Sequence, residues 1–260
     1  MSDHSQMKLG KRTPRHDPRT LKLARYLTPS LPTAPASVDY SRGFADWGML
    51  LNDQLGCCTI SAIGHAIQAW TMNSGSRVDF IDETVRFYYE KWDGYNPADP
   101  TTDQGGVELD VLNAWRNNKF GFAGRKLDAF VAVHTGTEGQ VISVNPADIR
   151  LAIWMFGGAY IGVELPLRAQ NQDVWGVVGD FGQDAPGSWG GHAIYLVAYD
   201  ENFLTCVTWG QLKKMTWGWF QKYCSEAYGL LSEDWIESSG IAPSGYDLDA
   251  LKKDLELVTV

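Results

Sequence analysis

Asn52-Asp53-Gln54-Leu55-Gly56-Cys57-Cys58-Thr59 is the stretch of this 260-residue chain that decides its fold. Beyond it, apolar residues recur at helical spacing: Ile60, Ile63, Ile67 and Trp70. This periodicity predicts a helix that begins at Cys58. Far downstream, Gly191-His192-Ala193 opens a run typical of a β-strand, and His192 follows Cys58 by 134 residues. A thiol at a helix start and a distant histidine between small residues are the minimum apparatus for thiolate chemistry.

Cys58 is the candidate nucleophile, because cysteine attacks as the thiolate and a helix N-terminus lowers the pKa of a thiol. His192 could form an ion pair with it and later protonate a leaving amine. Cys57 competes with it, as the nucleophile itself, as a redox partner or merely as a small residue. Its position one residue before the predicted helix makes Cys58 the preferred candidate. A small, buried and unreactive cysteine is the alternative interpretation of Cys58.

Two amide side chains upstream are candidates for an oxyanion hole. Such a site needs a side-chain donor beside the Cys58 N–H, and both Gln54 and Asn52 could supply one. Ordinary loop polarity is the alternative for each of them.

A third group should orient the imidazole of His192. Thr208 ends the predicted strand 203–208 and is the nearest polar side chain expected to face back beside the histidine. Asp200 and Asn202 are alternatives, although they belong to a hairpin-turn signal. Thr208 could also be a plain strand residue.

The other histidines and cysteines predict no metal site. His65 would lie about 10 Å along the helix from Cys58, so we expect it to be a core or supporting residue. His134 falls in a predicted loop, and Cys206 and Cys224 lack partners at zinc spacing. The glycine-rich residues 187–191 lack the lysine of a phosphate-binding loop. We therefore expect neither a metal nor a cofactor.

Charge divides the chain into a basic N-terminal arm, residues 1–37, and an acidic remainder. Residues 1–29 balance to +5, so the rest carries −14 of a total of −9. The arm holds five prolines, which predict an extended course. We expect it to dock on protein, either on the acidic body or on a partner, including another copy of the chain. An acidic body argues against nucleic acid as the main ligand.

The four cysteines, two of them adjacent, do not form a disulfide framework. No apolar run is long enough to cross a bilayer, and the polar N-terminus lacks the apolar core of a signal peptide. These features predict no membrane association and a reducing, cytoplasmic location, or a virion if the chain is phage-encoded.

Helical patterns come first along the chain and strand patterns follow. Predicted helices cover 58–70, 82–92, 108–118 and 149–156. Predicted strands cover 159–165, 193–199 and 203–208, and a further helix is predicted at 215–228. Residues 166–191 read as a long loop. The order predicts an α+β domain over residues 38–240, followed by a helical, acidic tail over 241–260.

Several segments, in order, resemble the motifs of the papain-like cysteine peptidases, particularly bacterial and phage members. Asp53 to Ala62 resembles the block that carries the nucleophile, and Gly191 to Asp200 resembles the histidine strand. Val207-Thr208-Trp209-Gly210 lies where Asn-Ser-Trp-Gly would stand. Residues 31–40, 103–115 and 156–163 also resemble motifs of the family.

The resemblance implies a two-lobed α+β fold with a cleft, a thiolate–imidazolium pair, and hydrolysis of a peptide or protein substrate without a cofactor. It implies that the substrate cleft is bordered by Gly105, Gly106, Gly191 and Trp209.

The chain departs from that pattern in three respects. Thr208 replaces the orienting asparagine, Asn52 occupies the position of the oxyanion glutamine while Gln54 comes two residues later, and Cys57 replaces the usual serine or glycine. An alternative function follows: a non-enzymatic structural protein, such as a phage virion component, that retains the fold. In a further alternative the arm covers the cleft as an inhibitory segment.

Overall fold

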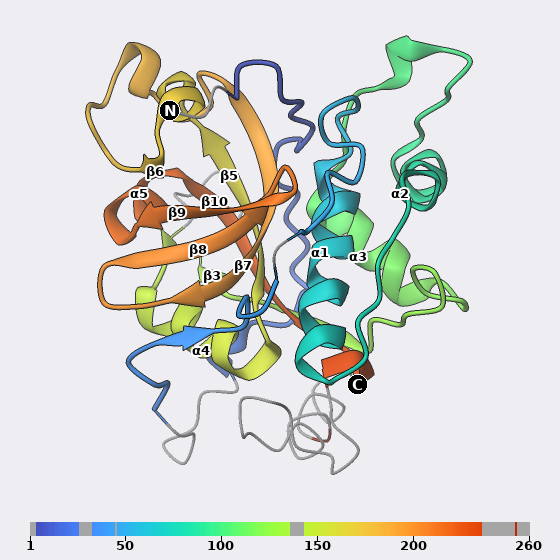
Figure 1. Cartoon of the computed structure of the whole chain (residues 1–260), viewed down its shortest axis with the longest axis horizontal. Helices are drawn as coiled ribbons and strands as arrows, with labels where there is room; N and C mark the ends of the chain where they lie inside the picture. Colours follow the sequence, from blue (N-terminus) through green and yellow to red (C-terminus); the bar gives the residue numbers. More distant parts are fainter. Residues whose placement is uncertain (1–3, 26–32, 45, 136–142, 236–252, 254–260) are drawn as a thin grey trace.

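The structure is a computed structural model that describes residues 4–25, 33–44, 46–135, 143–235 and 253. A helical half and a sheet half lie side by side (Figure 1). The helical half consists of α1 (Cys58–Asn73), α2 (Asp82–Tyr88) and α3 (Glu108–Asn117). The predicted α+β fold class is confirmed.

The sheet half is built on one large sheet. Its strands follow the order β2-β10-β5-β7-β8-β9-β6, and β1 pairs with β7 beside this path. All pairs in it are antiparallel except β6 with β9. The bounds are β1 Val38–Asp39, β2 Ala129–Ala132, β5 Ala159–Leu165, β6 Val174–Trp175, β7 Gly190–Tyr199, β8 Phe203–Thr208, β9 Gln211–Thr216 and β10 Cys224–Leu231. The short strands β3 (His134–Thr135) and β4 (Ser143–Val144) pair separately.

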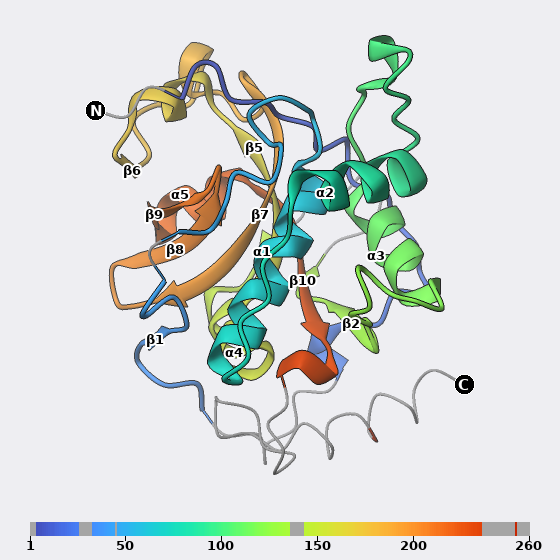
Figure 2. The same cartoon turned by 45° about the vertical axis from the view of Figure 1, so that its right-hand side comes forward.

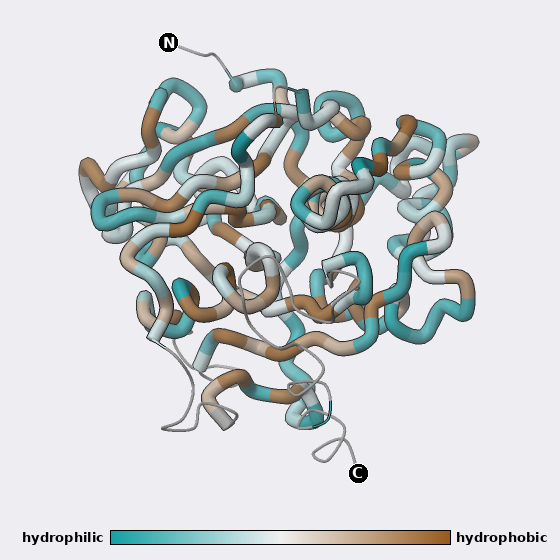
Figure 3. The backbone as a smooth tube through the Cα atoms, turned by 60° about the horizontal axis from the view of Figure 1, so that its bottom comes forward, coloured by the Kyte–Doolittle hydropathy of each residue, from teal (hydrophilic) through white to brown (hydrophobic). Residues whose placement is uncertain are grey.

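Helix α1 lies against β7 and joins the two halves (Figure 1). It is buried from Cys58 to Thr71, as expected for a helix with apolar residues on every side. Trp70 of α1 meets the ring of Tyr195 of β7 edge-on, with ring centroids 6.2 Å apart. Apolar stretches occur in both halves of the backbone (Figure 3), and one continuous core holds them together.

The predicted helix after residue 145 is confirmed as α4 (Pro146–Phe156). The side chain of Asn145 caps it by accepting from the Ala147 N–H, and Pro146 occupies the first turn, where it costs no hydrogen bond. Gly157 ends the helix at a φ of 71°, a left-handed conformation that favours glycine.

The helix predicted at 215–228 is wrong in its second half. Only α5 (Trp217–Tyr223) is helical, and it starts where the Thr216 hydroxyl accepts from the Trp219 N–H. From Cys224 onward the chain becomes β10, an inner strand between β2 and β5. Helical spacing of aromatic residues is a local signal, and pairing on both sides of this strand overrides it.

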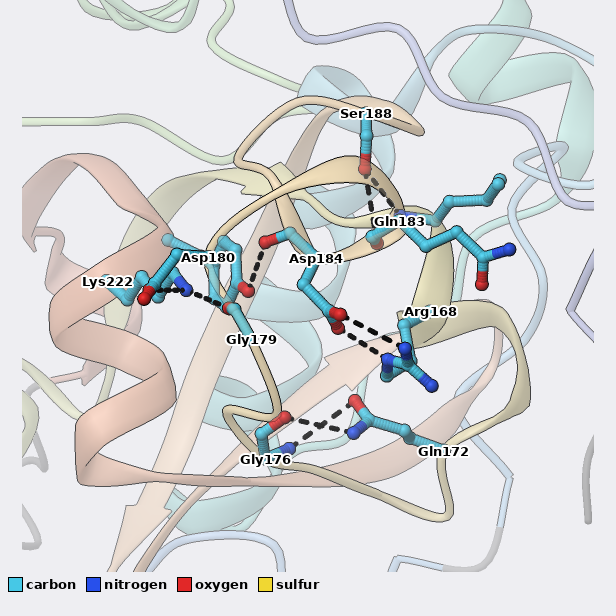
Figure 4. Close-up of polar contacts among 11 residues, drawn as sticks. Arg168, Gln172, Gly176, Gly179, Asp180, Gln183, Asp184, Ser188 and Lys222 are labelled. Atoms are coloured by element: carbon cyan, nitrogen blue, oxygen red, sulfur yellow. Dashed lines mark hydrogen bonds and ion pairs between the residues drawn. The ribbon is translucent and has the colours of Figure 1, made fainter.

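The predicted loop 166–191 is more ordered than expected. It contains β6 and two short 3-10 turns. Arg168 forms a two-pronged ion pair with Asp184, and Lys222 of α5 pairs with Asp180 (Figure 4). These contacts hold the segment against the sheet half, next to the start of β7.

The described part of the arm lies on the body of its own chain. Figure 2 shows it crossing from the sheet half to the helical half. The Lys11 N–H donates to the Gly191 carbonyl at 3.1 Å, and the Ala132 N–H donates to the Leu21 carbonyl at 2.7 Å. The predicted tail, 241–260, falls outside the described residues apart from Lys253.

Candidate active site between the two halves

Cys58 lies against the backbone of β7 next to His192, where α1 packs on β7. The Ala193 N–H, directly after His192, points its hydrogen at Cys58 Sγ with an N···S distance of 3.4 Å. Both side chains are fully buried. The antiparallel pairing of Val163 in β5 with His192 in β7 sets the register of the histidine in the sheet. Cys58 is thereby placed in contact with the residue that directly follows His192 in the chain.

Thr208 lies at the imidazole, as the sequence predicted. His192 Nε2 and Thr208 Oγ1 share a hydrogen bond of 2.7 Å. The indole of Trp209 stacks on the imidazole with ring centroids 4.6 Å apart and planes 17° apart. Asp200, the alternative, instead accepts two backbone N–H groups inside its own turn. The ring is therefore held at one nitrogen and on one face.

The thiol and the imidazole are both uncharged at neutral pH in this structure. Burial raises the pKa of Cys58 to about 12, against the opposing effect of the Ala193 and Gly10 N–H groups. Burial also lowers the pKa of His192 to about 3. Nδ1 of His192 has no hydrogen-bond partner among the described residues. The expected thiolate–imidazolium pair stays a prediction for a state in which water reaches the site.

Cys57 makes different contacts from Cys58. Its Sγ lies 3.6 Å from the Leu50 carbonyl and 3.5 Å from the Ser61 hydroxyl, which belong to the preceding loop and to its own helix. Burial raises its pKa as well. All four cysteines are free thiols, so no disulfide joins Cys57 to Cys58.

The two candidate oxyanion donors are placed differently. Asn52 is buried, and its Nδ2 lies 3.4 Å from the Lys8 carbonyl of the arm. Trp209 Nε1 lies 3.4 Å from the same carbonyl. Gln54 is exposed to solvent. Of the two amides, Asn52 is the one within reach of a carbonyl group inside the site.

The arm fills the space bordered by the predicted cleft glycines. The Gly106 N–H donates to the Gly10 carbonyl and the Arg12 N–H donates to the Gly106 carbonyl, both at 2.8 Å. With the bond from Lys11 to Gly191, the arm forms an added strand between the helical half and β7. A Cβ on Gly105 would stand 1.8 Å from the Gly10 carbonyl oxygen, so this approach requires glycine.

A supporting residue that the motifs did not reveal is Asp103. Its Oδ1 accepts from the Gly56 N–H at 2.9 Å and from the Tyr89 hydroxyl at 2.7 Å. The same hydroxyl accepts from the Gly105 N–H at 2.9 Å. Asp103 thus ties the loop before Cys58 to the glycine loop. Its place two residues before Gly105 was the available signal, but only the fold shows what it binds.

The remaining histidines serve the packing or the arm. His65 is buried with Nε2 3.1 Å from the Gly48 carbonyl, and burial lowers its pKa to about 4. His134 lies in β3 instead of the predicted loop, and its Nδ1 accepts from the Ala227 N–H. His4 of the arm stacks on Trp209 with ring centroids 5.1 Å apart.

Within the described ranges, no group of three or more His, Cys, Asp or Glu side chains is arranged to hold a metal ion. No helix in the described part of the chain combines the length and apolarity needed to span a bilayer.

The sequence matches no protein-family model and no curated protein. The structure is similar to xylellain, a cysteine protease from Xylella fastidiosa, with a TM-score of 0.61 and 14% identity over 86% of this chain and 96% of that chain. It is similar to the proform of the ragweed pollen cysteine protease Amb a 11, with a TM-score of 0.54 and 13% identity over 88% and 66% of the two chains. It is also similar to the cysteine protease and lectin-like domains of Cwp84 from Clostridium difficile, with a TM-score of 0.52 and 13% identity over 88% of this chain and 57% of that chain. Likeness at this level of identity concerns the fold: the chain has the two-lobed α+β fold of papain-like cysteine proteases.

Proposed function

We propose that this chain is a cysteine hydrolase that cleaves peptide bonds, with Cys58 as the nucleophile and His192 as the base and acid. The observation that carries the proposal is the contact between Cys58 Sγ and the N–H of Ala193, the residue after His192. Because Nε2 of His192 is bonded to Thr208 and Nδ1 has no hydrogen-bond partner among the described residues, we assign proton exchange with the thiol to Nδ1.

We further propose that the arm closes this site. The Gly10 N–H and the Ala193 N–H both act on Cys58 Sγ, and the arm backbone occupies the space between Gly106 and Gly191. When the arm leaves, water enters and the cost of charging buried groups falls. The pKa of Cys58 then falls and that of His192 rises, so that a proton moves from sulfur to Nδ1.

The open site can carry out amide hydrolysis in two steps. The thiolate attacks the carbonyl carbon, and the oxyanion accepts from the Cys58 N–H, which has no acceptor within the helix, and from Asn52 Nδ2. His192 gives its proton to the leaving amine as the C–N bond breaks, which leaves a thioester on Cys58. A water molecule then loses a proton to His192 and attacks the thioester, which releases the acid and the thiol.

Labelling with a peptidyl electrophile tests the proposal in the variant Gly10→Ala, whose added Cβ would stand 1.7 Å from the Gly56 carbonyl oxygen and should displace the arm; the modified residue is identified by mass spectrometry. We expect labelling at Cys58 that is lost in Cys58→Ala and His192→Ala and retained in Cys57→Ala. Peptide hydrolysis should follow the same order. Slow and equal labelling of all four cysteines would favour the alternative, a non-enzymatic protein with this fold.

A further inference from the structure

The side chain of Lys11 is enclosed by three carboxylates in the wall of the cleft. Its Nζ lies 3.0 Å from Glu164 Oε1 and 3.3 Å from Glu226 Oε1, and it also donates to the Arg12 carbonyl at 3.2 Å. Glu108 is the third carboxylate. The Lys11 side chain is fully buried although its backbone lies in the added strand of the cleft. The lysine is therefore inserted sideways from the cleft into the protein.

The floor of this pocket has the shape of a lysine side chain. A Cβ on Gly162 of β5 would stand 2.1 Å from Lys11 Cε and 2.7 Å from its Cδ. It would also stand 2.8 Å from Glu108 Oε1. Any larger residue at 162 would fill the space that the four-carbon chain occupies, so the glycine opens the pocket.

The pocket holds more acidic groups than Lys11 satisfies. Glu108 is fully buried, and neither of its carboxylate oxygens has a hydrogen-bond partner among the described residues. Glu226 is also fully buried, and its Oε2 accepts from the Tyr228 hydroxyl at 2.9 Å. Carboxyl groups removed from water need a cation or a proton. An empty pocket would be costly, so a cation should enter it whenever Lys11 leaves.

The pKa shifts of Lys11 and of the glutamates around it agree with a pocket that selects a charged amine. Burial opposes the charge of Lys11, but Glu226, Glu108 and Glu164 outweigh it and raise the pKa of Lys11. Burial raises the pKa of Glu108 well above its usual value and also raises the pKa of Glu226. Glu164 and Glu226 are the two groups in direct contact with the Lys11 ammonium group.

Open space adjoins the lysine pocket beside the arm. A cavity of about 480 Å³ adjoins Lys11 and includes Thr13, Val107 and Gly190 in its lining. Glu164 borders this cavity and is one-third exposed, so the pocket opens toward solvent on that side. A side chain that enters from the cleft can reach the carboxylates by this route.

We propose that this pocket, formed by Glu108, Glu164, Glu226 and Gly162, recognises a lysine side chain of the peptide substrate, and that Lys11 occupies it in the substrate's place. The inference rests on the proposed peptidase function. It assigns lysine to the substrate residue whose backbone pairs with Gly106, as Lys11 does.

The test uses the full chain with Lys11→Ala and Cys58→Ala, so that binding is measured without cleavage. Acetyl-Gly-Lys-Gly-amide is titrated by calorimetry against the same peptide with norleucine, which keeps the four-carbon chain and lacks the charge. We expect the lysine peptide to bind about 10- to 100-fold more tightly. Adding Glu164→Gln should shrink this ratio. The matched control carries Lys8→Ala in place of Lys11→Ala, because Lys8 is an exposed lysine of the same arm. This control keeps Lys11 in the pocket and should bind neither peptide.

A second probe applies if the shortened arm stays docked and excludes the peptide. Propylammonium supplies the atoms that Lys11→Ala removes, and it should raise the melting temperature of that variant in a saturable way. Propanol should not, and the wild-type chain should respond to neither. Equal binding of the two peptides, or the absence of any response to both lysine peptide and propylammonium, would overturn the proposal. Because neither readout involves Cys58, a failed labelling experiment with intact lysine selectivity would reject the peptidase and not the pocket.

Discussion

Gly10 of the arm lies against Gly56 of the nucleophile loop so closely that a Cβ on Gly10 would stand 1.7 Å from the Gly56 carbonyl oxygen. The arm can therefore lie over Cys58 only because residue 10 has no side chain. Gly105 approaches the Gly10 carbonyl just as closely and likewise leaves no room for a side chain. Three glycines from three segments thus permit one strand to enter the cleft.

Gly10→Ala should release the arm. Overpacking costs about 1–3 kcal/mol, which shifts the balance between docked and released arm about 5- to 150-fold. The rate of alkylation of Cys58 by iodoacetamide, followed by peptide mass spectrometry, should rise accordingly. Gly176→Ala is the control, because a Cβ there meets nothing within 4 Å. An unchanged rate in Gly10→Ala would show that the arm does not shield the thiol.

His192 should make stability depend on pH in a specific direction. Its pKa is about 3 when folded and near 6.5 when unfolded, so the unfolded chain takes up a proton first as the pH falls. Relative to His192→Gln, the wild type should lose up to about 1.4 kcal/mol of unfolding free energy per pH unit below pH 6.5, until about pH 3. Urea unfolding at a series of pH values measures the difference. Parallel curves for the two proteins would contradict a buried, neutral His192.

Thr208→Val should destabilise the protein. The change keeps the shape and removes the hydroxyl that bonds His192 Nε2, so a buried ring nitrogen loses its partner at a cost of about 1–3 kcal/mol. Thr208→Ser keeps the hydroxyl and should retain most of the stability. Urea unfolding compares the three proteins. Equal stability of the valine and serine variants would mean that the bond is not important.

Asp103→Ala should loosen both loops that Asp103 joins. The Gly56 N–H and the Tyr89 hydroxyl would lose their acceptor, at about 1–3 kcal/mol. Hydrogen exchange should then speed up at Gly56 and Gly105 together. Tyr89→Phe, which removes the bond to Asp103 and the bond from the Gly105 N–H but leaves the bond from Gly56 to Asp103, should speed exchange chiefly at Gly105. Faster exchange at only one loop in Asp103→Ala would contradict the linkage.

The sequence was sufficient for elements with strong local patterns. Helix α1 and strands β5 and β8 agree with the predictions because their apolar periodicity is uninterrupted. Strand β10 was missed because its state depends on β2 and β5, which are distant in the chain. Tertiary pairing of this kind leaves no mark on the strand's own sequence.

The candidate site was predictable where a motif carried it, and not where it depended on how distant segments meet. The bond between His192 and Thr208 agrees with the prediction, and Cys58 contacts the residue after His192, whereas the choice between Asn52 and Gln54 depended on the course of the loop. Leu50 and Leu51 both adopt positive φ there, which no sequence pattern announces. The pocket around Lys11 draws its residues from three separate segments, α3, β5 and β10, so no spacing rule could reveal it.

The central claim is that His192 activates the Cys58 thiol once the arm is released. The most direct test compares the pH dependence of Cys58 alkylation in Gly10→Ala with that in Gly10→Ala/His192→Ala. If His192 holds the thiol as an ion pair once the arm is released, alkylation should continue well below pH 7 and should lose this low-pH reactivity in Gly10→Ala/His192→Ala. Reactivity that appears only near the ordinary thiol pKa of about 8.5, and that is the same with and without His192, would contradict the account.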